Sequence, residues 1–264
     1  FVQPAGEAQL CQAAALCREL AVPCYLLGNG SNILFGDKGY AGAVISLTGM
    51  KGEVRREGDT LTAPAGMPLN ALCMAALHAG LTGLEFAYGI PGTVGGAVYM
   101  NAGAYGGEMA QVVSEVSALF PEAGIRTLSG ADLVFGYRRS FLTEYPDAVV
   151  LRASFRLGPG DPDAIRASMR ELMEKRRASQ PLEWPSAGST FKRPEGHFAG
   201  TLIDQCGLKG LTVGGAQVSE KHAGFVVNRG GATAADVREL IEKVQAAVLE
   251  QTGVRLEPEV KIIH

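Results

Sequence analysis

The sequence has little of what marks a nucleic-acid, membrane or metal-binding protein. Its 264 residues hold 24 Lys and Arg against 27 Asp and Glu, and no basic stripe accumulates along any segment, which disfavours a nucleic-acid partner. The longest apolar runs fall well short of about 18 residues, so neither a transmembrane helix nor a signal peptide is expected. Five cysteines, without zinc spacing or a CxxC pair, indicate reduced core thiols. We therefore expect a cytoplasmic protein without a metal site.

The signatures of two common enzyme classes are also missing. There is no GxSxG elbow and only four histidines, so no serine hydrolase is expected. Gly28-x-Gly30 is half of the dinucleotide fingerprint GxGxxG, but Ile33 stands where the third glycine should be, and an extended segment follows instead of a helix. The backbone N–H groups of residues 28–32 can still form an anion-binding nest, and a tight hairpin turn is an equal alternative.

Glycine is abundant in one place. Eight of the 25 residues from Gly83 to Gly107 are glycine, and almost none of the others is charged. Glycine lets the backbone turn through positive φ and approach a flat or phosphorylated ligand closely. Because the intervening residues are mostly apolar, unlike those of a flexible Gly/Ser linker, the stretch predicts a rigid binding loop. The alternative is a series of tight turns in an all-β region.

Apolar periodicity predicts helices and strands mixed along the chain. Because its length exceeds the usual single-core limit of about 250 residues, two or three domains are expected. Helical spacing, with a Thr233–Asp236 capping box before the last helix, predicts helices over 7–20, 68–80, 161–177 and 233–252. Short apolar or alternating runs predict strands over 24–27, 33–35, 42–47, 52–63 (broken at 57–59), 112–120, 124–128, 149–157 and 225–228.

Three other places carry candidate chemistry. Arg138 and Arg139 are framed by aromatic residues, which suggests a guanidinium in a shaped pocket; an exposed cationic edge strand is the simpler alternative. Ser189 lies in a segment rich in Gly and Ser and lacks an obvious base, so a structural turn serine is the default. Glu257 and Glu259 stand two apart on an extended terminal segment. If that segment is a buried strand, one carboxylate faces inward, and if it is an edge strand, both are solvated.

Seven motifs occur in one order over nearly the whole chain: GNGSNIL at Gly28, GIPGTVGGAVYMNAGAYG at Gly89, YRRSF at Tyr137, PSAGSTFKRP at Pro185, GTLID at Gly200, KHAGFVVN at Lys221 and LEPEV at Leu256. Each alone is weak, but jointly they are very specific. In this combination the chain resembles the family of UDP-N-acetylenolpyruvoylglucosamine reductases, which are flavoenzymes of peptidoglycan precursor synthesis and so of cell wall biogenesis, cell shape and cell division.

This resemblance implies an α+β fold of the vanillyl-alcohol oxidase type, in which FAD lies between two α+β subdomains and a third α+β domain covers the substrate. The expected division is a discontinuous first FAD-binding domain of residues 1–51 and 253–264, a second of residues 52–178, and a substrate-binding domain of residues 179–252. The short passage from Ser140 to Pro181 leaves no room for a Tyr-bearing lid insertion, so the shorter-lid type is expected. We also expect a monomer.

The reaction implied by the resemblance has two halves. NADPH reduces the flavin and leaves, and the enolpyruvyl substrate then takes a hydride on its β-carbon and a proton on its α-carbon. By position, Ser189 resembles the proton donor, while Arg138 and Glu259 resemble the pair that binds and polarises the substrate carboxylate. Arg138 can offer a bidentate fork, although Arg139 is an alternative. Glu259 would have to hold or share a proton, so we expect its pKa to be raised in the holoenzyme.

The resemblance also assigns binding residues. Non-covalent FAD contacts are expected from Gly28, Asn29, Gly30, Ser31, Asn32, Ile90, Pro91, Gly92, Gly95, Gly96, Asn101, Ala102 and Gly103. Substrate contacts are expected from Tyr137, Lys192, Arg193 and His222. Relatives carry a leading T-x-x-x-G-G-P-A stretch, of which only Pro4-Ala5 would remain here, and a trimmed chain would leave part of the adenine side of the FAD site incomplete.

Two other functions stay open from the sequence. An FAD-dependent oxidase of the same fold often tethers FAD covalently through a histidine in the first-domain loop, and the loop from Gly28 to Asn32 has none. A non-catalytic flavin or sugar-nucleotide binding protein would keep the glycine loops but would have no use for Arg138, Ser189 and Glu259 together.

Overall fold

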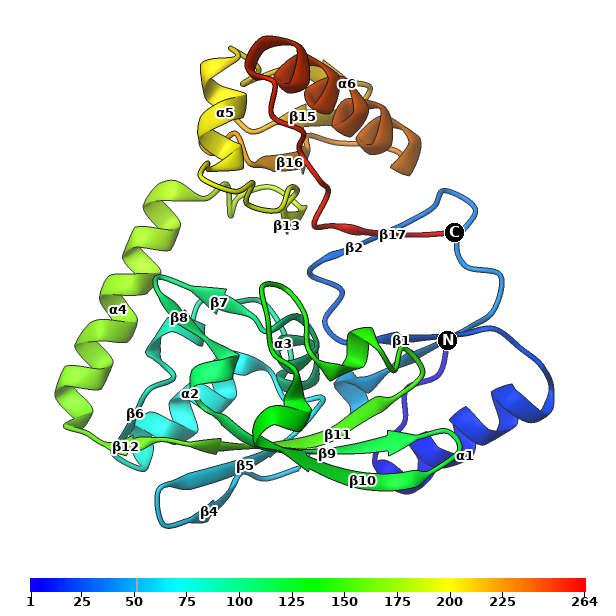
Figure 1. The fold of residues 1–264 in the computed structure, drawn as a ribbon, viewed down its shortest axis with the longest axis vertical. Helices are drawn as coiled ribbons and strands as arrows, with labels where there is room; N and C mark the ends of the chain where they lie inside the picture. Colours follow the sequence, from blue (N-terminus) through cyan, green and yellow to red (C-terminus); the bar gives the residue numbers. More distant parts are fainter. Residues whose placement is uncertain (51) are drawn as a thin grey trace. The chain divides into compact units, whose positions relative to one another are not determined.

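A computed structural model describes residues 1–50 and 52–264, and these divide into two compact units. The first unit comprises Phe1–Asn29 and Gly42–Glu174, and the second comprises Gly30–Ala41 and Lys175–His264 (Figure 1). The domain boundary predicted after residue 51 falls on a residue outside the described ranges, and the three-domain division stays a prediction.

The first unit is built on a five-stranded sheet in the order β10-β9-β11-β5-β4, in which every neighbouring pair is antiparallel. Its central strand, β11, has the sequence VVLRASFR, whose β-branched and apolar residues suit a strand that is paired on both sides. The strands are β4 (Arg55–Glu57), β5 (Thr60–Pro64), β9 (Val113–Phe120), β10 (Gly124–Ser129) and β11 (Val149–Arg156).

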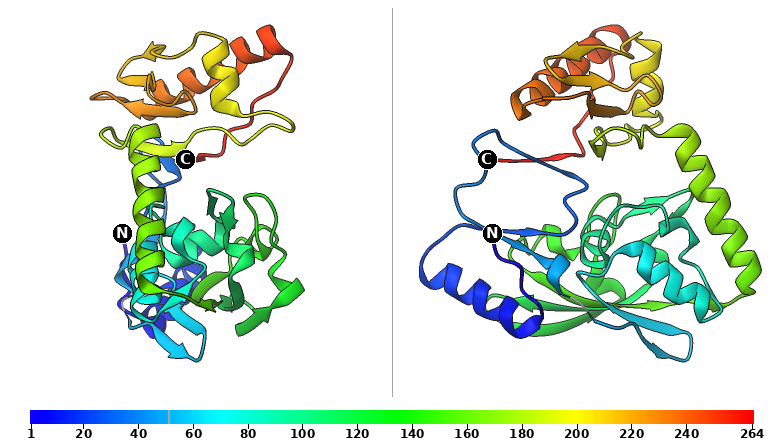
Figure 2. Two further views of the ribbon diagram at one scale, coloured as in Figure 1. Left: turned by 90° about the vertical axis from the view of Figure 1, so that its left-hand side faces the viewer. Right: turned by 180° about the vertical axis from the view of Figure 1, so that it is seen from behind.

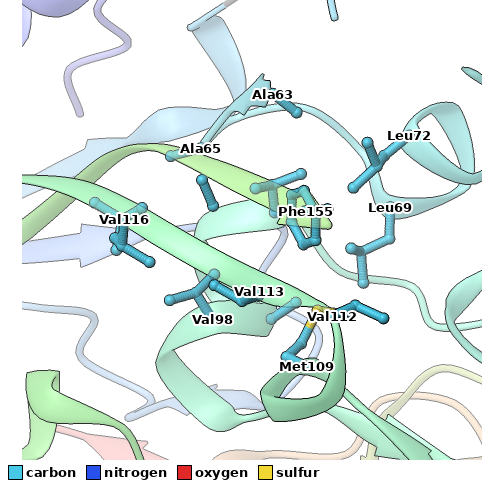
Figure 3. Packing of buried hydrophobic residues seen from close by; sticks show 14 of the residues in the cluster. Ala63, Ala65, Leu69, Leu72, Val98, Met109, Val112, Val113, Val116 and Phe155 are labelled. Carbon is cyan, nitrogen blue, oxygen red and sulfur yellow. The ribbon is translucent and has the colours of Figure 1, made fainter. Parts of the chain in front are cut away.

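The core of the first unit lies between this sheet and two helices, α2 (Leu69–His78) and α3 (Val94–Met100), which cover one face of the sheet (Figures 1 and 2). Leu69, Leu72, Val98 and Phe155 are fully buried there. Figure 3 shows these side chains gathered with Val113 of β9. Burying one such side chain stabilises the folded state by about 1.5–3 kcal/mol. The spacing of the apolar residues therefore decides which face each helix buries.

The rest of the first unit surrounds this core. α1 (Glu7–Glu19) buries Leu10 and accepts a hydrogen bond from the Arg152 guanidinium of β11 through Glu7. β1 (Cys24–Leu27) pairs in parallel with β3 (Ala43–Ser46). The unit also contains the short strands β6 (Leu81–Thr82), β7 (Gly103–Ala104), β8 (Gly107–Glu108) and β12 (Gly158–Pro159). Helix α4 (Pro162–Ser179) contributes residues to both units.

The second unit has a four-stranded antiparallel sheet in the order β13-β16-β15-β14, against which α6 packs (Figure 1). Its C-terminal strand β17 pairs in parallel with β2. The elements are β2 (Ile33–Phe35), β13 (Ser186–Ser189), α5 (Ala199–Gln205), β14 (Thr212–Val213), β15 (Ala216–Val218), β16 (Phe225–Asn228), α6 (Ala234–Thr252) and β17 (Lys261–Ile263). The predicted Thr233–Asp236 capping box opens α6, and the hydrogen bond from the Thr233 amide lowers the pKa of Asp236.

Most predicted elements are confirmed, and three of the alternatives that the sequence left open are wrong. The alternative of tight turns in an all-β region fails, because the glycine-rich stretch contains the helix α3. A hairpin turn at residues 28–32 fails too, because β1 pairs with β3 and β2 pairs with β17. The segment around Arg138 is not an edge strand, because it forms a tight turn followed by a 3₁₀ turn at Phe141–Thr143.

No helix within residues 1–50 and 52–264 combines the length and the apolar character that crossing a membrane requires.

Candidate functional site

In the first unit, the two glycine-rich segments predicted to bind FAD lie against each other. A Cβ atom on Gly28 would stand 2.7 Å from Oγ1 of Thr93, so only glycine permits this approach. The Asn29 side chain adds a hydrogen bond of 2.8 Å from its Nδ2 to the carbonyl oxygen of Pro91. Segments that are more than 60 residues apart in sequence are thereby joined at one place.

Helix α3 starts at this place for a local reason. Thr93 is its N-cap, with an extended backbone and a side-chain oxygen that accepts a hydrogen bond of 3.3 Å from the amide of Gly96. Gly95 brings the helix close to the sheet, because a Cβ there would lie 3.0 Å from Cβ of Ala65. Thr93 was not among the residues predicted for the site, although a threonine directly before an apolar run is a recognised N-cap signal.

These segments fit the binding of a large, non-covalent cofactor. Gly96 is exposed and Gly92 is half-buried, so the backbone at both positions is open to a ligand with no side chain in the way. No histidine lies between residues 28 and 32 or between residues 90 and 103, so neither segment offers a histidine for covalent attachment. The residues present therefore fit FAD held by backbone contacts and by the Asn29 loop.

Arg138 lies at the tip of a two-residue turn in the first unit. Gly136 and Arg139 exchange both backbone hydrogen bonds, of 3.1 and 3.2 Å, so Tyr137 and Arg138 form the tip. Arg138 has a left-handed backbone with φ of 56°, which is costly for a residue with a long side chain. Its guanidinium lies 5.1 Å from the centre of the exposed Tyr137 ring.

The same turn gives Arg139 a different position. A Cβ on Gly136 would stand 2.7 Å from Nε of Arg139, so the Arg139 side chain folds back across the turn. The side chain of Arg138 is half-buried, whereas Arg139 is exposed. This geometry favours Arg138 over Arg139 as the residue that presents its guanidinium to a ligand.

In the second unit, Ser189 and Glu259 lie on paired segments. The amide of Glu259 donates to the carbonyl oxygen of Thr190 at 2.8 Å, and an isolated bridge joins Phe191 with Pro258. Both Ser189 and Glu259 are half-buried. The hydroxyl of Ser189 donates a long hydrogen bond of 3.3 Å to the carbonyl oxygen of Phe191, so its proton has a weak partner within the protein.

Thr190 holds these segments to the sheet of the second unit. It is 4% exposed, its amide donates to the carbonyl oxygen of Gly224 at 2.8 Å, and its Oγ1 accepts from the amide of Val226 at 3.0 Å. Its carbonyl oxygen accepts the hydrogen bond from the amide of Glu259, so Thr190 links β16, Ser189 and the C-terminal segment. Thr190 was not among the residues predicted for the site, because the sequence pattern carries no signal for this role.

Glu257 and Glu259 differ in exposure. Glu257 is exposed and accepts a hydrogen bond of 3.1 Å from Nζ of Lys192, with its side chain 68% exposed. Glu259 is half-buried, and the Nδ2 of Asn32 donates to its backbone oxygen at 3.2 Å. Glu259 is therefore the less solvated of the two, although the segment is not a regular strand.

The other predicted substrate contacts also belong to the second unit. The guanidinium of Arg193 lies 3.8 Å from the centre of the exposed Phe198 ring. Nδ1 of His222 accepts a hydrogen bond of 3.1 Å from the amide of Gly224, so the neutral ring carries its proton on Nε2. Burial lowers the pKa of His222 and favours this neutral form.

The predicted site residues are thus distributed over both units. Arg138 and Tyr137 belong to the first unit together with Gly28, Asn29 and the glycine-rich stretch. The second unit contains the other predicted residues: Gly30, Ser31, Asn32, Ser189, Lys192, Arg193, His222 and Glu259.

Comparison with known proteins places these features in a class. Residues 1–129 match the FAD binding domain family, and residues 180–263 match the family described as UDP-N-acetylenolpyruvoylglucosamine reductase, C-terminal domain. An enzyme of that name from Clostridium botulinum (strain Hall) is 48% identical over 263 residues, covering 100% of this chain and 85% of its own length. Another, from Levilactobacillus brevis, is 52% identical over 249 residues, covering 94% and 81%.

A solved structure agrees with these matches. The crystal structure of UDP-N-acetylenolpyruvylglucosamine reductase from Thermus caldophilus superposes with a TM-score of 0.80 at 39% identity, covering 94% of this chain and 88% of that one. The protein is thus an FAD-dependent oxidoreductase with the predicted α+β, vanillyl-alcohol oxidase type of fold. More narrowly, the chain belongs to the UDP-N-acetylenolpyruvoylglucosamine reductase family.

Proposed function

We propose that this chain reduces the enolpyruvyl group of UDP-N-acetylenolpyruvoylglucosamine with NADPH, giving UDP-N-acetylmuramate for peptidoglycan precursor synthesis. The observation that carries the proposal is the presence, in one chain, of an FAD-binding match over residues 1–129 and a reductase C-terminal match over residues 180–263. The similarity to enzymes of that name over the whole chain supports the same substrate.

FAD, when bound, accepts a hydride from NADPH and supplies it to the β-carbon of the enolpyruvyl group. The residues proposed to hold FAD are those of the two adjoining glycine-rich segments, around Gly28 and Gly92. Their proposed part is to hold and orient the cofactor. Because their backbone groups already lie on a packed helix and loop, binding the cofactor costs them little conformational entropy.

Arg138 is proposed to bind the substrate carboxylate. A guanidinium offers two parallel N–H donors that match the two carboxylate oxygens. Hydride addition at the β-carbon places negative charge on the neighbouring carboxylate system, so a fixed cation there stabilises the transition state more than the ground state. The left-handed backbone of Arg138 supports a functional reason for its position, because strain of this kind gathers at ligand-binding sites.

Ser189 is proposed to deliver the proton to the α-carbon, and Glu259 to assist at the carboxylate. A serine hydroxyl is a weak acid, so it acts only when the receiving carbon is already carbanion-like and the geometry is fixed. The weak hydrogen bond from Ser189 to Phe191 leaves its proton available at small cost. Lys192, Arg193 and His222 are proposed contacts for the diphosphate and sugar.

We further propose that the protein acts in the cytoplasm as a monomer. Its five cysteines are all free, which fits a reducing compartment.

Anaerobic mixing of the FAD-loaded protein with NADPH, followed by addition of the enolpyruvyl substrate, tests the function. The expected result is bleaching of the flavin band at about 450 nm by NADPH and its return with stoichiometric substrate. Reoxidation that needs oxygen and ignores the substrate would indicate an oxidase instead. A flavin that NADPH does not reduce would indicate a binding protein.

A further inference from the structure

Asn101 ends helix α3 in an unusual way. It is the C-cap residue, with a left-handed backbone at φ of 42°, and it is only 1% exposed. Both polar atoms of its side chain are bonded within the first unit. Oδ1 accepts a hydrogen bond of 2.8 Å from the amide of Ala110, and Nδ2 donates one of 3.0 Å to the carbonyl oxygen of Gly136. A buried amide used in this way has little left to offer a cofactor.

The Gly136 oxygen is the one that closes the arginine turn. It accepts one hydrogen bond of 3.2 Å from the amide of Arg139 and another from Nδ2 of Asn101. The side chain of Asn101 is therefore hydrogen-bonded to the base of the turn whose tip carries Arg138. The turn is 35 residues away from Asn101 in sequence. Because the amide is buried, this bond is less exposed to competition from water than a surface one.

A second buried side chain holds the other end of the turn. Ser140 directly follows Arg139 and is 1% exposed, and its hydroxyl donates a hydrogen bond of 3.1 Å to the carbonyl oxygen of Tyr99 in the last turn of α3. The C-terminus of α3 therefore holds the arginine turn from both sides, through Asn101 before the tip and through Ser140 after it.

We propose that Asn101 is a positioning residue for Arg138, with Ser140 as its counterpart on the other side of the turn. This inference rests on the proposed role of Arg138 at the substrate carboxylate, and it replaces a direct contact between the Asn101 side chain and FAD. A left-handed backbone at Arg138 costs conformational free energy, so it persists only where the surrounding structure holds the turn. Without that hold, the guanidinium would not keep a single direction. The two buried hydrogen bonds provide that hold.

Three variants test the proposal in the FAD-loaded enzyme. Asn101→Gly removes both side-chain hydrogen bonds while keeping a residue that adopts the left-handed conformation without strain. Ser140→Ala removes the second tether. Ser114→Ala is the matched control, because it deletes a similar hydrogen bond of 3.2 Å from a serine hydroxyl to a carbonyl, that of Ser154, elsewhere in the same unit.

The readout is the rate of each half-reaction, measured alone and in an Arg138→Ala background. Asn101→Gly and Ser140→Ala should each slow flavin reoxidation by the enolpyruvyl substrate about tenfold, leave reduction by NADPH and FAD content unchanged, and have less than about a twofold effect once Arg138 is alanine. Ser114→Ala should change neither half-reaction.

Three results would overturn the inference. Loss of FAD or slower reduction by NADPH in Asn101→Gly would indicate a cofactor contact. An undiminished effect in the Arg138→Ala background would indicate a general structural role. If Arg138→Ala alone leaves reoxidation unchanged, the proposed role of Arg138 fails and the positioning role fails with it. Should Asn101→Gly not fold, Ser140→Ala decides by the same criteria.

Discussion

The amide nitrogen of Glu259 donates a hydrogen bond of 2.8 Å to the carbonyl oxygen of Thr190, the residue next to Ser189. The side chains of Ser189 and Glu259, 70 positions apart in sequence, are thus carried on two hydrogen-bonded backbone segments of one unit. In the proposed reaction these are the proton donor and the assisting carboxyl group. Their shared backbone link gives a physical reason for a functional carboxyl group so close to the C-terminus.

Glu259→Gln should change the pH dependence of the second half-reaction. The amide keeps the size of the side chain and can still donate a hydrogen bond, but it no longer titrates, so the limb of the pH profile that belongs to Glu259 should disappear. The rate of flavin reoxidation by substrate, measured across pH 5 to 9, checks this. The exposed Glu257→Gln variant is the control, and an unchanged profile in Glu259→Gln would count against the assignment.

Thr190→Val should destabilise the second unit. Valine matches the shape of threonine but leaves the buried amide of Val226 without its acceptor, which costs about 1–3 kcal/mol. Urea denaturation measures the loss. The exposed Thr212→Val variant should stay within about 0.5 kcal/mol of the parent. Equal effects of the two substitutions would mean that the Thr190 hydroxyl has no special part in holding Ser189 and Glu259.

Gly28→Ala should weaken FAD binding. The added methyl group would meet Oγ1 of Thr93 at 2.7 Å, and Thr93 cannot move freely because it is 2% exposed and caps α3. The loop must therefore shift away from the glycine-rich stretch. Flavin fluorescence titration should give a dissociation constant raised about tenfold or more, as expected for overpacking of 1–3 kcal/mol. Gly6→Ala, where a Cβ meets no atom within 4 Å, should bind FAD normally.

His222 should make the protein less stable as the pH falls below neutral. Burial lowers its pKa in the folded state, so below about pH 6.5 the unfolded chain takes up a proton that the folded chain does not, and folding loses free energy. Protonation of Nδ1 would also break its bond with the Gly224 amide. Thermal unfolding between pH 7.5 and 5.5 should show a shallower decline in His222→Gln, while the exposed His78→Gln variant should follow the parent.

Much of the fold follows from apolar periodicity, because long amphipathic patterns such as those of α4 and α6 admit one placement. Helix α3 does not follow from apolar periodicity, because Gly95 and Gly96 lower helix propensity. It forms because Thr93 caps its N-terminus and Val98 packs into the core. The pairing of β2 with β17 could not be predicted from local sequence patterns either, because it joins segments more than 200 residues apart.

For the candidate site, motif order indicated the residues that we propose to carry the chemistry, but not the residues that hold them in place. Asn101 and Thr190 act through backbone groups distant in sequence, and no spacing rule reports such contacts. Lys192 shows the reverse case: its charge suggested a diphosphate contact, and the structure adds a partner, Glu257, that a ligand would have to displace.

The central claim, that Arg138, Ser189 and Glu259 act on the substrate and not on the flavin, is tested most directly by anaerobic stopped-flow spectroscopy of Arg138→Ala, Ser189→Ala and Glu259→Gln. Each variant should be reduced by NADPH at the parent rate, and each should then be reoxidised by the enolpyruvyl substrate at least about 100-fold more slowly. Parent-like reoxidation in all three variants would contradict the account.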